Sequence, residues 1–120
     1  MDILSAEEKL AGWVRAAAGT GPVFRGSLPP GVRNGFELNL VSGIPAGPCR
    51  VNEFTARVRG ISSDKSALWR AFQALFAALP LEKHEGLLYA EVQGEVLFSM
   101  EEREGLLLHS GSVDLKVSFV

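Results

Sequence analysis

The residue types that most often carry out chemistry in proteins are sparse in this sequence. Its 120 residues include one cysteine, Cys49, and two histidines, His84 and His109. A nucleophilic thiol needs a neighbouring base, and only His84 and His109 could supply one. A lone cysteine also cannot form a disulfide within the chain. We therefore interpret Cys49 as a small residue near a strand end.

Metal binding and acid–base catalysis are also poorly supported by the spacing of polar residues. Glu82, His84 and Glu85 could contact a cation in a loop, but a solvated charge cluster is the simpler interpretation. The charged residues 101–104 would be hydrated on a hairpin tip, with nothing to perturb them. No Gly-x-Ser-x-Gly elbow, P-loop or dinucleotide fingerprint is present in the sequence. We predict no catalytic residue, no metal ion and no cofactor, and therefore no enzyme.

Composition and charge narrow the class of protein further. Hydrophobic residues make up 47% and charged residues 22%, which is ordinary for a globular chain, and the length suits one domain spanning residues 1–120. The net charge of −2 gives no electrostatic footprint for nucleic acid or anionic membranes. No apolar run approaches the ~18 residues of a membrane span, and the N-terminal residues do not resemble a signal peptide. We expect synthesis in a reducing cytoplasm, without membrane partners or sequence-specific nucleic acid binding.

Two segments have the apolar periodicity of helices. Ser5 and Glu8 have the spacing of a capping box. The first helix then has one apolar face, formed by Leu10, Trp13, Val14 and Ala17. Asp64 is an N-cap candidate for a second helix that ends at Pro80. Its apolar stripe contains Leu68, Phe72, Leu75, Phe76 and Leu79. Trp69 lies off the centre of this stripe and is either a core residue at its edge or an interface residue.

The remaining segments alternate like strands or carry strand-forming residues. We expect strands at residues 23–28, 36–41, 51–59, 86–92, 96–100 and 113–119. Gln93-Gly94 separates the first two of the last three strands, residues 101–105 read as a charged turn, and residues 106–108 could extend a strand on its far side. The order is α-β-β-β-α-β-β-β, with strands in groups. This grouping predicts an α+β fold, with a mixed or antiparallel sheet and two helices packed on one face.

Several of these segments resemble a known family. Residues 23–30 (Val-Phe-Arg-Gly-Ser-Leu-Pro-Pro), 36–40, 43–45 and 54–60, with the helix after Asp64, are similar to the small tail-terminator proteins of tailed bacteriophages, often labelled phage minor capsid proteins. The resemblance implies a homo-oligomeric ring, commonly a hexamer, on the head-proximal end of the tail tube. Such a ring ends tube growth and joins the tail to the head connector. It implies tail tube and head–tail connector proteins as partners, and a place in the virion after assembly in the bacterial host cytoplasm.

A ring requires different surfaces of one chain to meet between copies. Residues 1–60 carry a net charge of +2 and residues 61–120 carry −4. Alternation along residues 51–59 directs Arg57 and Arg59 away from the core. The expected subunit interface therefore contains Arg57, Arg59, Trp69, Glu101, Glu102 and Glu104. Two alternatives remain open: a small-molecule-binding or regulatory α+β module, possibly a dimer, and an enzyme with scattered catalytic residues.

Overall fold

The structure is a computed structural model that describes residues 3–18, 22–44, 52–79, 81–84 and 87–119. Its elements in chain order are α1 (Ile3–Ala18), β1 (Val23–Arg25), β2 (Gly35–Ile44), β3 (Asn52–Ser62), α2 (Lys65–Ala77), β4 (Leu81–His84), β5 (Leu87–Arg103) and β6 (Leu106–Phe119). The predicted α+β class and element order are confirmed.

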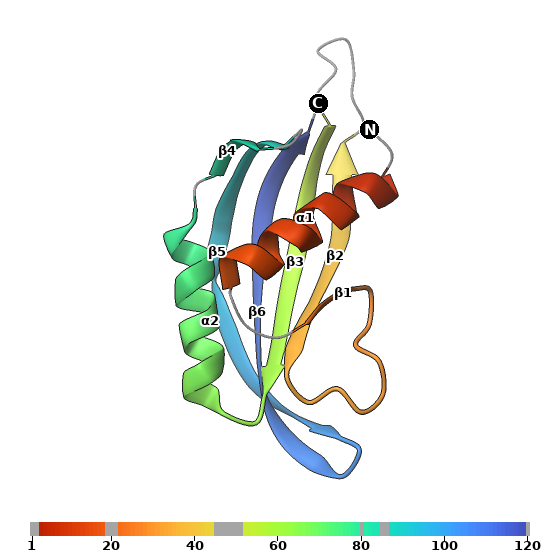
Figure 1. Cartoon of the computed structure of the whole chain (residues 1–120), viewed down its shortest axis with the longest axis vertical. Coiled ribbons are helices and arrows are strands. Elements are labelled where there is room, and N and C mark those ends of the chain that lie inside the picture. The colour runs from red at the N-terminus through yellow and green to blue at the C-terminus, as the bar shows by residue number, and fades with distance from the viewer. Residues whose placement is uncertain (1–2, 19–21, 45–51, 80, 85–86, 120) are drawn as a thin grey trace.

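All six strands form one mixed sheet in the spatial order β1-β2-β3-β6-β5-β4. β1 runs parallel to β2, and every other neighbouring pair is antiparallel. Both helices lie on the same face of this sheet, as predicted, and α1 crosses over β2 and β3 (Figure 1). We call this the helix face, and the opposite side the open face.

The main core lies between the helices and the sheet. The predicted helical stripes are confirmed: Leu10, Trp13 and Val14 of α1 and Leu68, Phe72 and Leu75 of α2 are buried. Phe76 and Leu79 are partly buried against the same core. The sheet contributes alternate residues of its central strands, namely Ala56, Val58, Val113, Leu115 and Val117. Burying these side chains on one face of each element is the main stabilising contribution to the fold.

The two predicted helix starts have different outcomes. Asp64 caps α2 as expected, because its Oδ1 accepts a hydrogen bond of 2.9 Å from the backbone N–H of Ser66. The predicted capping box is wrong, because α1 already begins at Ile3 and Ser5 lies inside it. Neither glycine nor proline precedes Ser5 to stop the helix from starting earlier.

The first predicted strand is shorter than expected. β1 ends at Arg25, three residues before the predicted end at Leu28. Gly26 follows with φ +82°, a left-handed conformation that turns the chain away from β2.

The strands predicted at residues 86–92 and 96–100 are one strand, β5. Gln93-Gly94 is a bulge and not a turn. β5 advances four residues, from Gln93 to Leu97, while β6 advances only two, from Asp114 to Ser112. Gly94 has φ +86°, which absorbs the extra residues without reversing the chain. Three strands were predicted after the second helix, and three are present, but the additional one is β4 (Leu81–His84), in a region that was predicted to be a loop.

The turn between β5 and β6 is tighter than expected. Only Glu104 and Gly105 leave the ladder, with φ 51° and 79°. Two residues with positive φ are typical of a type I′ hairpin, whose twist matches that of the flanking strands. Residues 101–103, predicted to lie in the turn, therefore belong to β5.

Candidate interaction surfaces

The predicted interface arginines lie on the open face of β3, and both are paired within the chain. Arg57 Nε donates to Asp114 Oδ1 at 2.9 Å, and Nη2 donates to Oδ2 at 3.3 Å. This hydrogen bonding, with the attraction of the Asp114 charge, raises the pKa of Arg57 above its ordinary value. The Arg57 side chain remains 51% exposed, so water screens the pair.

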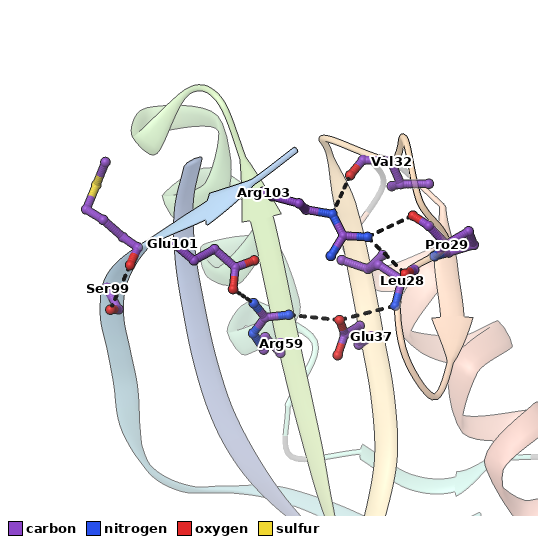
Figure 2. Close-up of polar contacts among 9 residues, drawn as sticks. Leu28, Pro29, Val32, Glu37, Arg59, Ser99, Glu101 and Arg103 are labelled. Atoms are coloured by element: carbon purple, nitrogen blue, oxygen red, sulfur yellow. Dashed lines mark hydrogen bonds and ion pairs between the residues drawn. The ribbon is translucent and has the colours of Figure 1, made fainter. Parts of the chain in front are cut away.

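Arg59 is the centre of a less exposed network (Figure 2). Its Nη1 donates to Glu37 Oε1 at 2.8 Å, and its Nη2 forms an ion pair with Glu101. Glu37 Oε1 also accepts from the backbone N–H of Leu28 at 3.2 Å. The network connects β2, β3 and β5 to the segment that follows β1.

Arg103 contacts this segment from the hairpin side (Figure 2), and the neighbouring Glu104 contacts it as well. Arg103 donates to three backbone carbonyl oxygens, those of Leu28, Pro29 and Val32, at 2.8 to 3.1 Å. Glu104 Oε1 accepts from the backbone N–H of Gly31 at 3.0 Å. Beneath these contacts, Leu28, Ile61 and Leu108 form a small buried cluster on the open face.

These contacts occupy charges that were predicted to pair between copies of the chain. The structure brings Arg59 and Glu101 together, but inside one chain and not between copies. The prediction that Glu101 is fully hydrated is wrong, since it is half-buried and ion-paired. Glu102 and Glu104 are exposed, as expected for the tip of a hairpin. The sequence pattern placed Arg59 on the correct face, but the carboxylates it meets come from β2 and β5.

Trp69 belongs to an exposed group of apolar side chains on the helix face. Its ring lies 5.7 Å from that of Phe98 on β5, and Phe98 in turn lies 6.5 Å from the buried ring of Phe72. The Lys65 ammonium lies 5.5 Å from the centre of the Phe98 ring. We call Trp69, Phe98 and Met100 the aromatic surface; they are 47%, 39% and 45% exposed.

Sequence reasoning identified Trp69 but missed Phe98 and Met100. Both lie in a segment that reads as an ordinary strand, and their spacing of two residues places them on one face. That spacing was the available signal. It does not reveal that this face of β5 extends beyond the cover of α2.

A groove of about 650 Å³ lies at the other end of the sheet, between α1 and the edge formed by β1 and β2. It is lined by Leu4, Glu7, Glu8, Ala11, Arg15, Val23, Phe24, Arg25, Gly26 and Asn39. Arg25 donates to the backbone carbonyl of Leu4 at 3.1 Å. Small-molecule pockets are mainly apolar and enclosed, whereas this groove is open and has four charged side chains in its lining. It therefore gives no specific support to a metabolite-binding module.

The residues considered for catalysis or metal binding do not form a site among the described side chains. His109 lies half-buried on β6 opposite Met100, whereas Cys49 and the His84 side chain fall outside the described part of the structure. Among the described side chains, no three His, Cys, Asp or Glu residues are grouped to hold a metal ion. No helix in the described ranges is long and apolar enough to cross a membrane.

Comparison with known proteins does not assign the chain to a family. No family model matches this sequence, and no curated protein matches it significantly.

Proposed function

We propose that this protein is a structural subunit of a bacteriophage tail. Copies of it form a ring, commonly of six, on the head-proximal end of the tail tube. The ring ends tube growth and offers a surface to the head–tail connector. Binding and assembly, and not catalysis, are then its activity.

The observation that supports assembly most strongly is the aromatic surface. The rings of Trp69 and Phe98 adjoin, Met100 lies two residues further along β5 on the same face, and each of the three is about two-fifths to half exposed. Aromatic residues and methionine are enriched in protein–protein interfaces, where burying them supplies much of the affinity. The resemblance to tail-terminator proteins implies a sheet with two helices, and the α+β fold of this chain agrees with that expectation.

Tail tubes provide a direct test of the proposal. Purified protein is mixed with polymerised tail tube protein from the same phage, and binding is followed by co-sedimentation and electron microscopy. We expect additional density at one end of each tube. We also expect tubes to stay shorter when the protein is added during polymerisation. Failure to bind tubes, with the fold intact by circular dichroism, contradicts the proposal.

A matched pair of variants tests the contribution of the aromatic surface. Trp69→Ser removes an exposed aromatic ring, and we expect it to weaken assembly at least about tenfold, typical of an interface hot spot. Leu106→Ser removes an apolar side chain that is 37% exposed on the opposite face of the hairpin, and we expect little effect. Equal effects of the two variants would argue against the aromatic surface.

A further inference from the structure

The outer edge of β2 is only partly covered. β1 pairs with β2 from Phe36 to Leu38 and then leaves at Gly26. Among the described residues, no strand pairs with that side of β2 from Asn39 to Ile44. The groove described above lies at this point, with α1 as its other wall. Unpaired backbone N–H and C=O groups at a sheet edge can add a further strand.

The opposite end of the sheet has a second uncovered edge. β4 pairs with β5 only from Leu87 to Ala90. From Glu91 to Arg103, no described strand lies on the outer side of β5. This stretch carries Leu97, which is 65% exposed on the open face, the side of the sheet opposite to the aromatic surface. Exposed polar and apolar side chains both occur along it, and an unpaired edge with exposed apolar residues favours pairing with another chain.

The strand directions make these two edges compatible with each other. β2, β3, β6 and β5 are consecutive neighbours, and each pair is antiparallel. β5 therefore runs opposite to β2. If a second copy stands beside the first in the same orientation, its β2 meets β5 in an antiparallel arrangement. A cyclic ring requires each copy to meet the next through the same contact, repeated by rotation about the ring axis.

We propose that copies of this chain join edge to edge, the β5 stretch around Leu97 of one copy entering the groove beside residues 39–44 of the next. This deepens the proposed function and rests on its ring, since it names the contact that would hold the ring together. The contact is heterologous, because two different edges meet. It can therefore repeat around a closed ring.

The helix layer supports the same pairing. If the sheet continues from one copy to the next, the helix faces of both copies lie on the same side. The α1 helix of the second copy would then lie beside α2 of the first (Figure 1). Leu4 lines the groove on α1 and is 59% exposed. It would then cover Trp69 and Phe98 of the neighbouring copy. The pairing thus buries apolar side chains that are exposed in the single chain.

Charged side chains lie on both sides of this contact. Arg15 and Arg25 line the groove and donate to main-chain carbonyl oxygens, and neither forms an ion pair with a described carboxylate. The free part of β5 carries Glu95 and Glu102, exposed and likewise without an ion pair among the described residues. Glu7 and Glu8 of α1 also line the groove, so its net formal charge is zero and the attraction is limited to local contacts of the two arginines. Such rim charges orient association more than they add affinity.

The free edges of β2 and β5 lie at different positions along the strand direction. Asn39, where the free edge of β2 begins, shares a row through Arg57 and Asp114 with Gln93 of β5. Pairing with the stretch around Leu97 therefore requires neighbouring copies to be offset along the strands. Closed sheets need such an offset, because their strands tilt relative to the axis.

Cysteine cross-linking tests which edges meet. In a Cys49→Ser background, Ser42→Cys marks the edge of β2 and Ser99→Cys marks β5. When the two single-cysteine chains are mixed under oxidising conditions, or with a short bifunctional thiol reagent, we expect a cross-linked dimer. The double variant should give a ladder that ends at the ring size. Each single variant alone should give no cross-link, as should Ser99→Cys mixed with Lys116→Cys, whose site lies on the interior strand β6.

A pair of leucine variants tests the same contact by mass in solution and on tail tubes. Leu97 and Leu107 are both 65% exposed, but only Leu97 lies on the free edge of β5, whereas Leu107 lies on β6 beyond the end of its pairing with β3. A charge on an edge strand opposes edge-to-edge pairing. We therefore expect Leu97→Lys to sediment as a single chain and to lose the cross-link, while Leu107→Lys assembles normally.

The outcomes separate this proposal from the proposed function. If copies cap tail tubes without the cross-link between residues 42 and 99, edge pairing is wrong and the tail function stands. A cross-linked ring that does not bind tubes supports edge pairing and contradicts the tail function. If copies neither associate in solution nor bind tubes, both proposals are wrong. Dimers from one single-cysteine variant alone would indicate a two-fold contact and would also overturn the edge pairing proposed here.

Discussion

Arg57 and Arg59 are two residues apart on one strand and face the same side of the sheet, yet their surroundings differ. The Arg57 side chain is 51% exposed and that of its partner, Asp114, is 33% exposed. The Arg59 side chain is 26% exposed and that of Glu37 is only 14% exposed. Glu101 adds a second carboxylate to Arg59. Removing the arginine charge lowers the stability of the fold more where the carboxylates are less exposed, because water can solvate them less well once the arginine is gone.

We therefore predict that Arg59→Met destabilises the fold by about 1–3 kcal/mol, while Arg57→Met costs below about 1 kcal/mol. Methionine keeps most of the apolar stem in both variants, so the difference reports the lost charge and hydrogen bonds. Urea denaturation measures both free energies of unfolding. Equal losses would mean that the Arg59 network contributes no more than an exposed ion pair.

The packing of α2 on the sheet depends on two glycines that face each other. Gly60 on β3 is paired with Gly111 on β6. A Cβ atom on Gly60 would lie 2.7 Å from Phe36 Cε1 and 2.8 Å from Leu68 Cδ1, and one on Gly111 would lie 2.8 Å from Phe72 Cε2. All three distances are below van der Waals contact. The absence of side chains here lets the helix approach the sheet closely.

We predict that Gly60→Ala destabilises the fold by about 1–3 kcal/mol, because the added methyl forces buried side chains to move. Gly12→Ala is the matched control. Gly12 lies in α1 and has no atom within 4 Å of its added Cβ, so the same change should stabilise the fold by about 0.5–1 kcal/mol through helix propensity. Thermal and urea unfolding give both values. A neutral Gly60→Ala would show that α2 can shift away at little cost.

At the scale of the whole molecule, one apolar core joins both helices to all four long strands. Buried side chains from α1, α2, β2, β3, β5 and β6 belong to the same cluster. The described residues extend over 50 × 26 × 22 Å, with the sheet spanning the long dimension. A small domain with a single core generally unfolds in one cooperative step.

The two tryptophans allow this cooperativity to be measured. Trp13 lies on α1 and is 8% exposed, and Trp69 lies on α2. In Trp69→Phe, fluorescence reports only the surroundings of α1, while far-ultraviolet circular dichroism reports the whole fold. We predict that the two signals change at the same urea concentration. A fluorescence transition at lower urea would show that α1 detaches before the sheet unfolds.

Local side-chain periodicity determined which segments become helices and strands and which faces they bury. The spacing of Leu10, Trp13 and Val14 is readable without any partner, because it reflects the turn of the helix itself. The alternation that directs Arg57 and Arg59 away from the core is equally local. The class of fold followed from the order of these segments.

Only the tertiary structure decided which segments meet. β5 is one strand and not two, because β6 runs alongside its full length and accommodates the bulge at Gly94. Arg59 meets Glu37 and Glu101 because the register of three strands brings them to the same place. The exposed edges likewise depend on where β1 and β4 stop pairing. Such features depend on contacts between residues distant in sequence, and the pattern within any one segment carries no record of them.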